Sequence, residues 1–374
     1  MINFANPLEN NKKYKSKILF KLSEVISSNK YILGNENKIL ENKIKKFTKA
    51  KYAIALNSGT DALICSLIAA GIKSGDEIIA PSHTATATIT AIKTLKAKVK
   101  FADISEEDFN VDVTDLKKKI SKKTKAIIVV HIYGNPAKID KIMSLVRNKK
   151  ISIIEDCAQA MGTKFKNKHV GTFGDFGCLS FFPTKNLSAI GDAGAIILNS
   201  KANYKKLLKI RQYGWNDKRI SVLDGINSRC DEMQAAILNL KIDHLNEFTL
   251  NRRRIASFYN LKLAKLPLVL PVERENGKHS YHLYVIRISS KLRKKFLYFM
   301  KNNGINLGIH YYPPTHKMKT FKINIKLKNT DYISEQIVSL PMYPELKNKE
   351  LNYIVNKIKL FFNKNKYSKF ALSI

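Results

Sequence analysis

Short apolar runs that stop at polar or turn-forming residues recur along the first part of the chain. They cover residues 52–56, 76–80, 99–103, 126–131, 151–154, 178–182 and 195–198. Such runs are typical of buried strands when turn residues bound them. The intervals carry apolar residues at helical spacing, so the pattern predicts strands alternating with helices. This alternation indicates an α/β fold, with a mostly parallel sheet flanked by helices on both faces.

The pattern differs on either side of this region. Residues 1–50 have apolar positions at helical spacing and predict a helical lead-in, and the same period from Arg229 to about Lys265 predicts one long helix between two domains. Beyond it, a small α+β domain is indicated by strands at 281–288 and 307–311 and by helices at 293–301 and 351–362. We therefore expect a large domain over residues 1–250 and a small domain over residues 251–374.

Two of the predicted strands end in ionisable residues. The run 151–154 is followed by Glu155 and Asp156, and the run 178–182 leads into Pro183, Thr184 and Lys185. Ligands of open α/β sheets bind beyond the carboxyl ends of the strands, so Asp156 and Lys185 are expected to meet at one site.

A carboxylate and a lysine in this position suit pyridoxal phosphate. The lysine amine forms a Schiff base with the aldehyde of the cofactor, and the carboxylate pairs with its protonated ring nitrogen. Either residue alone has a simpler explanation, a surface lysine or a helix-capping aspartate, and it is their combination that favours the cofactor.

The surrounding motifs resemble a known family. EDCAQAMG, then VGTFGDFGCLSFFPTKN, then GDAGAI are similar to the DegT/DnrJ/EryC1/StrS family of pyridoxal-phosphate-dependent sugar aminotransferases, and the resemblance runs over nearly the whole chain. It implies the fold type I architecture, with Lys185 as the Schiff-base lysine and Asp156 as the partner of the ring nitrogen. It also implies that Gln159 contacts the 3-hydroxyl of the cofactor and that Ser180 binds its phosphate.

The resemblance assigns further residues to the site, each with a structural alternative. Gly59 and Thr60, in the loop that leads into a helix predicted over residues 62–70, match the phosphate contacts, although a plain capping turn has the same sequence. Asn227 matches an asparagine that reaches the phosphate of the partner subunit, or else it only forms a turn. His310 and Tyr311 match the substrate side, or they are a buried pair at a strand end.

One position departs from the family pattern. Many relatives have an aromatic residue two positions after His83, where it stacks on the cofactor ring, and this chain has Ala85 there. Either His83 covers the ring instead, or it is a purely structural histidine.

The activity implied is transfer of an amino group, by analogy from L-glutamate, to a keto group on a nucleotide-linked sugar in a homodimer with shared active sites. Such sugars serve cell-surface polysaccharides, including lipopolysaccharide, or secondary metabolites. A 3-keto sugar is expected because Ser228 and Glu232 resemble the residues of the family members that aminate C3 of the sugar. Ser228 would widen the sugar pocket, or it would only cap the helix that follows it. The alternatives are a pyridoxal-phosphate-binding regulator without turnover and a dehydratase-type relative, which would carry histidine in place of Lys185.

The composition of the chain argues against several other classes of protein. No apolar run approaches the roughly 18 residues of a membrane helix, and the N-terminal residues show no signal peptide. The four cysteines lack CxxC spacing, which argues against a zinc site or a disulfide framework and predicts reduced thiols in a cytoplasm. The net charge of +36 leaves open a nucleic-acid binder, but the lysines are spread along the chain, which favours a solvated surface over specific nucleic-acid binding.

Overall fold

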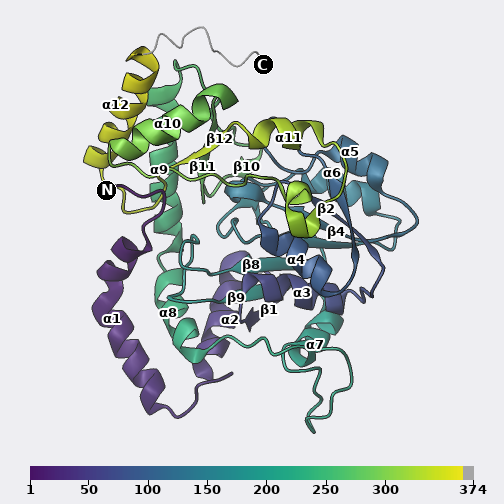
Figure 1. The fold of residues 1–374 in the computed structure, drawn as a ribbon. Helices are drawn as coiled ribbons and strands as arrows, with labels where there is room; N and C mark the ends of the chain where they lie inside the picture. The colour runs from purple at the N-terminus through teal and green to yellow at the C-terminus, as the bar shows by residue number, and fades with distance from the viewer. Residues whose placement is uncertain (365–374) are drawn as a thin grey trace.

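The computed structural model describes residues 1–364 and has a seven-stranded sheet at its centre (Figure 1). The sheet has the order β1-β9-β8-β5-β4-β2-β3. Its strands are β1 (Tyr52–Leu56), β2 (Glu77–Pro81), β3 (Lys98–Ala102), β4 (Thr124–Val130), β5 (Ser152–Asp156), β8 (Phe176–Ser180) and β9 (Gly194–Leu198). Only β9 runs against its neighbours, so the predicted mostly parallel sheet is confirmed.

Helices cover both faces of this sheet (Figure 1). Alternate residues of each strand enter different apolar clusters: Ile127 and Val129 of β4 pack on one face, and Ile128 and Val130 pack on the other. The helices of this part are α1 (Pro7–Ser27), α2 (Asn35–Thr48), α3 (Gly59–Ala69), α4 (Thr86–Thr94), α5 (Val113–Lys119), α6 (Ile139–Val146), α7 (Lys201–Ile210) and α8 (Glu232–Ile242). A second sheet, in the order β10-β6-β7, joins β6 (Lys164–Phe165), β7 (Lys168–His169) and β10 (Gly277–Lys278).

The predicted long helix from Arg229 to Lys265 is wrong. The chain forms α8 and then α9 (Leu245–Leu263), with non-helical residues at Asp243 and His244 between them. Figure 1 shows α9 running from the end of α8 toward the C-terminal helices.

The residues of α9 belong to two apolar clusters. Leu245 and Phe248 pack with the large sheet, whereas Ile255 and Tyr259 pack in a third cluster formed by C-terminal elements. The division at residue 250 remains a proposal, and this change of cluster within α9 supports it.

The C-terminal part contains a two-stranded antiparallel sheet packed with helices. Its elements are β11 (Tyr284–Arg287), α10 (Ser290–Asn302), α11 (Lys328–Ser334), β12 (Ile337–Leu340) and α12 (Asn348–Lys364). The expected strand at 307–311 is reduced to a single bridge between Gly308 and Ser339.

The N-terminal residues also join this C-terminal part. Ile2 forms a bridge with Ile305, and the backbone N–H of Met342 donates to the carbonyl of Phe4 at 3.0 Å. The chain then enters α1, which lies alongside α8 (Figure 1). Residues 2–6 therefore connect the C-terminal sheet with the helices of the large sheet.

Candidate active site

The two central residues of the site are carried by neighbouring parallel strands. Asp156 is the last residue of β5, and β8 beside it leads into a turn in which the N–H of Lys185 donates to the carbonyl of Phe182 at 2.8 Å. The two side chains interact electrostatically, as the sequence predicted from their places at strand ends.

Lys185 is held in a form suited to nucleophilic and proton-transfer chemistry. Burial lowers the pKa of its ammonium from 10.5 to about 8, although the negative charge of Asp156 acts in the opposite direction. About a tenth of the amine is therefore unprotonated at pH 7, far more than for a lysine with the ordinary pKa of 10.5, and this is the form that attacks a carbonyl or accepts a proton.

Asp156 is almost fully buried, and hydrogen bonds fix both of its carboxylate oxygens. The hydroxyl of Thr88 donates to Oδ2 at 2.8 Å, and the backbone N–H of Ala158 donates to Oδ1 at 3.1 Å. The carboxylate is thereby kept at the strand end in a set orientation.

The start of α3 forms a small-residue cradle against β8 and β9. A Cβ atom added to Gly59 would lie 2.6 Å from the Cβ of Ser180, and one added to Gly194 would lie 2.3 Å from the carbonyl oxygen of Ser58. Glycine is thus required at both positions for this close approach. The first N–H groups of a helix have no acceptor within it, so Gly59 and Thr60 offer donors to an anion beside the Ser180 hydroxyl.

His83 lies beyond the end of β2 and is 1% exposed. Its Nε2 is 2.5 Å from the hydroxyl of Tyr133, and that hydroxyl donates to the carbonyl of His310, so Nε2 is the protonated nitrogen of His83. The buried Nδ1 has no partner within residues 1–364. Burial also lowers the pKa of His83 to about 4, so the ring is neutral.

Gln159 connects this region to the predicted substrate side. Its Oε1 accepts from the N–H of Tyr133 at 2.6 Å, and its Nε2 donates to the hydroxyl of Tyr311 at 2.7 Å. The second N–H of this amide is left for another acceptor.

A cavity of about 260 Å³ opens beside Lys185. Its walls include Phe4, His282, His310 and Tyr311, and the ring of Phe4 lies 5.2 Å from that of His310. His310 and Tyr311, expected from the sequence to face the substrate, thus lie at the same cavity as Lys185.

The structure corrects the expectation about Ser228. Its buried hydroxyl donates to Asp61 at 2.8 Å and accepts from the N–H of Asn57 at 3.3 Å, so it adds no group to a sugar pocket. It does not cap a helix either, because α8 begins at Glu232 with Asp231 as its N-cap.

Glu232 likewise has a structural role, since its carboxylate accepts hydrogen bonds from the backbone N–H groups of Gly34, Glu36 and Asn37 at the start of α2. Asn227, in contrast, is exposed, and its side chain makes no hydrogen bond within the described part of the chain.

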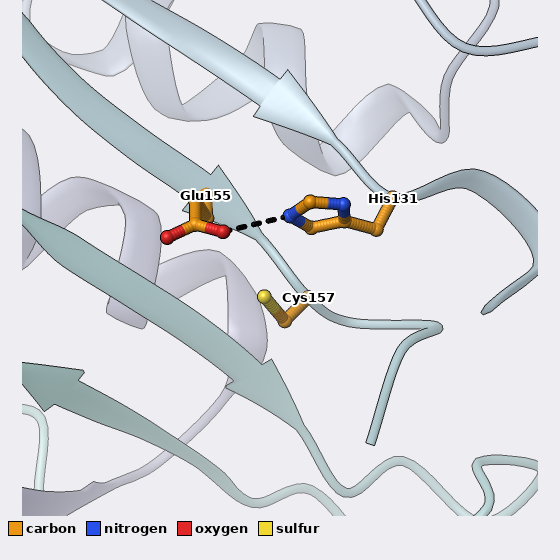
Figure 2. Close-up of side chains that lie close together, drawn as sticks. All are labelled: His131, Glu155 and Cys157. Carbon is orange, nitrogen blue, oxygen red and sulfur yellow. Dashed lines mark hydrogen bonds and ion pairs between the residues drawn. The ribbon is translucent and has the colours of Figure 1, made fainter. Parts of the chain in front are cut away.

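Figure 2 shows a buried group of potential metal ligands, His131, Glu155 and Cys157, of which the last two flank Asp156 in the chain. The carboxylate of Glu155 already accepts hydrogen bonds from Nε2 of His131 at 2.9 Å and from the N–H groups of Gly171, Phe173 and Gly174. Nδ1 of His131 accepts from the N–H of Ala137 at 3.0 Å.

Hydrogen bonds and burial shift the pKa values of Glu155 and Cys157 in different directions. Burial alone would raise the pKa of Glu155, but the hydrogen bonds from His131 and the loop outweigh it and lower that pKa, while burial raises the pKa of the Cys157 thiol. Because the ligand atoms of His131 and Glu155 are occupied by hydrogen bonds, these two residues act as structural links between the ends of β4 and β5 and the loop at 171–174.

A comparison with protein-family models matches residues 12–359 to the DegT/DnrJ/EryC1/StrS aminotransferase family. The chain belongs to this family. The predicted family, fold, enzyme class and pyridoxal phosphate cofactor are confirmed by this match and by the similar structures.

The aminotransferase is similar to several characterised proteins along nearly its full length. It is 38% identical to the pleiotropic regulatory protein of Geobacillus stearothermophilus, covering 93% of this chain and 95% of that one. It is 35% identical to the UDP-N-acetyl-3-dehydro-alpha-D-glucosamine 3-aminotransferase of Acidithiobacillus ferrooxidans, covering 92% and 94%. Among solved structures, S. venezuelae DesV in complex with a ketimine intermediate has a TM-score of 0.93 and 29% identity, covering 96% of this chain and 98% of that chain.

Sequence reasoning missed several residues of the aminotransferase site. Tyr133 comes shortly after the end of β4, at the same edge of the sheet as Asp156 at the end of β5, so the strand-end rule would have found it. Thr88 lies inside α4, and His282 lies just before β11. No sequence pattern marks either position as part of a site. Phe4 comes from the far N-terminus, and only the tertiary structure brings it to the cavity.

Proposed function

We propose that this aminotransferase moves an amino group from an amino acid, expected to be L-glutamate, to a keto carbon of a nucleotide-linked sugar. The observation that carries the proposal is the meeting of Lys185, with its lowered pKa, and Asp156 at adjacent strand ends beside a cavity.

The roles of the site residues follow from their chemistry. Pyridoxal phosphate, when bound, supplies the electron sink that acidifies the hydrogen on the substrate carbon. Asp156, oriented by Thr88, holds the proton of the ring nitrogen, and Lys185 removes and returns the proton at the substrate carbon. Gly59, Thr60 and Ser180 would hold the phosphate group, and Gln159 would donate to the 3-oxygen. The neutral ring of His83 would cover the cofactor ring in place of the aromatic residue that relatives have at the position of Ala85.

We propose a 3-keto sugar as the acceptor. The support is the activity for which the Acidithiobacillus relative is named, the amination of a 3-dehydro sugar linked to UDP. The original reason from Ser228 no longer applies, since its hydroxyl is used within the protein. A product of this kind serves the synthesis of cell-surface polysaccharides or secondary metabolites, and we propose that the enzyme works in the cytoplasm. Within residues 1–364, no helix is long and apolar enough to cross a membrane.

We further propose a homodimer in which Asn227 reaches the phosphate site of the partner subunit. Large apolar side chains are exposed around the start of α8 and near Lys185, namely Tyr31, Ile32, Phe182, Ile190 and Met233. The N–H of Glu232 donates to the carbonyl of Tyr31, and the N–H of Ile190 donates to the side-chain Oε1 of Gln234. Several of these residues therefore share one region. A second copy of the chain that packs against these apolar side chains would lie close to the turn that carries Lys185.

The test is to offer matched 3-keto and 4-keto sugars on UDP and on dTDP, with L-glutamate as donor, and to measure specificity constants. We expect amination at C3 to be preferred, to be lost in Lys185→Ala and to be retained in Lys149→Ala, which replaces an exposed lysine. Preference for the 4-keto sugars would overturn the assignment of C3. Cofactor binding without turnover of any sugar would favour the regulatory alternative, and loss of a sugar hydroxyl instead of gain of an amine would favour the dehydratase.

A further inference from the structure

The cavity beside Lys185 is almost free of charge. Apart from Lys185 its walls are apolar, hydroxyl-bearing or histidine side chains, with no arginine and no carboxylate. Burial lowers the pKa of His310 to about 4 and holds that of His282 well below its usual range, so both rings are neutral. The volume of about 260 Å³ is slightly below the range of about 300–1,000 Å³ common for small-molecule sites, which suits a single sugar ring.

The tautomer of His282 is set by Asn186. Nδ2 of Asn186 donates to the carbonyls of Met161 and Ser280 at 3.4 and 3.3 Å, so its Oδ1 is an acceptor. Nδ1 of His282 lies 3.2 Å from this Oδ1 and must therefore carry the proton. Nε2 of His282 is left unprotonated, with a lone pair and no partner within the described residues.

An unprotonated imidazole nitrogen accepts hydrogen bonds and cannot donate them. It can pair with a hydroxyl group of a sugar, but it offers nothing to the carboxylate groups of an amino-acid donor. The two substrates that share this cavity in turn thus differ in their use of His282.

We propose that Nε2 of His282 accepts a hydrogen bond from a hydroxyl group of the acceptor sugar, beside the carbon that reacts, and so contributes to the choice of sugar. This inference rests on the proposed function. Asn186 acts as the positioning residue, because its amide presents the lone pair of His282 to the cavity.

Two substitutions test the roles of Nδ1 and Nε2 of His282 separately. His282→Asn places an amide N–H where Nδ1 donates to Asn186 but has nothing at the position of Nε2. His282→Gln reaches the position of Nε2 with an amide oxygen, which can accept the same hydrogen bond. The pair therefore distinguishes loss of the acceptor from general disturbance of the site.

The main measurement is calorimetric binding of the 3-amino sugar product, linked to UDP or to dTDP, to the cofactor-loaded enzyme. The loss of one hydrogen bond predicts up to about tenfold weaker binding to His282→Asn, which corresponds to about 1.4 kcal/mol, the upper part of the range for one such bond. Binding of UDP or dTDP alone should be unchanged, and His282→Gln should recover most of the affinity. In stopped-flow absorbance, the half-reaction with glutamate should keep its rate in His282→Asn, and the half-reaction with the keto sugar should slow.

The outcomes separate this inference from the function on which it rests. If the wild-type enzyme neither binds nor aminates any nucleotide sugar, the proposed function fails and the inference falls with it. If the wild type is active and His282→Asn binds the product equally well, only the inference fails. Equal slowing of both half-reactions, or equally weakened binding of the free nucleotide, would also overturn it, since His282 would then act on Lys185 or on the fold.

Discussion

Replacing the active-site lysine by methionine should make the cofactor-free protein more stable. Lys185→Met keeps a long unbranched side chain and removes an amine that the folded protein holds in an unfavourable environment. Substitution of a largely buried active-site residue is usually expected to destabilise the fold. A gain in stability would show that Lys185 is present for its chemistry and not for its contribution to folding.

The size and the pH dependence of the effect follow from the pKa of Lys185. Burial lowers this pKa from 10.5 to about 8 in the folded protein, and a shift of one unit corresponds to about 1.4 kcal/mol. Below pH 8 the ammonium therefore destabilises the folded state by up to about 3 kcal/mol, an upper limit because Lys185 is partly exposed. Between pH 8 and 10.5 the unfolded chain binds more protons than the folded one, so stability rises with pH and the penalty disappears.

The assay is urea unfolding of both proteins, stripped of cofactor, at pH 7, 9 and 10.5. The gain in free energy of unfolding for Lys185→Met should be largest at pH 7 and close to zero at pH 10.5. Lys149→Met, at an exposed position, should change little at any pH. A variant that is less stable than wild type, or a difference that does not vary with pH, would refute the reasoning.

The other predictions concern turnover. Asp156→Asn should still bind the cofactor but should lose activity about a thousandfold, because a neutral amide gives up roughly 4 kcal/mol of support for the ring proton; a change below tenfold in steady-state assays would show that the ring proton is held in another way. Mixing inactive Lys185→Ala and Asn227→Ala proteins should restore up to about a quarter of wild-type activity, since half of the dimers then carry one intact site. No recovery, despite subunit exchange seen by native mass spectrometry, would argue against a shared site.

The parts of the site that could be predicted from the sequence are those tied to strand ends. Asp156 and Lys185 each follow a buried apolar run, and parallel strands bring such positions to one edge of a sheet. The same logic places Gly59 and Thr60 just after β1, although the helix predicted from residue 62 begins at Gly59 in the structure.

The remainder depends on contacts that local sequence does not encode. The break at Asp243 and His244 has no glycine or proline, and the helical period continues across it, so nothing in the local sequence marks it. The residues on both sides of the break pack in the same apolar cluster, and the chain reaches the C-terminal cluster only later, within α9. Ser228 resembled a pocket residue until its partners, Asp61 and Asn57, were located about 170 positions away in sequence.

The place of Phe4 in the cavity wall has a practical consequence for work with this protein. Residues added ahead of Met1 would emerge beside the bridge between Ile2 and Ile305, only a few positions from a side chain that lines the cavity. An N-terminal affinity tag could therefore alter substrate affinity without touching the cofactor, and its effect would be mistaken for weak native activity. Kinetic comparisons of this enzyme are best made with the tag at the other terminus, or after its removal.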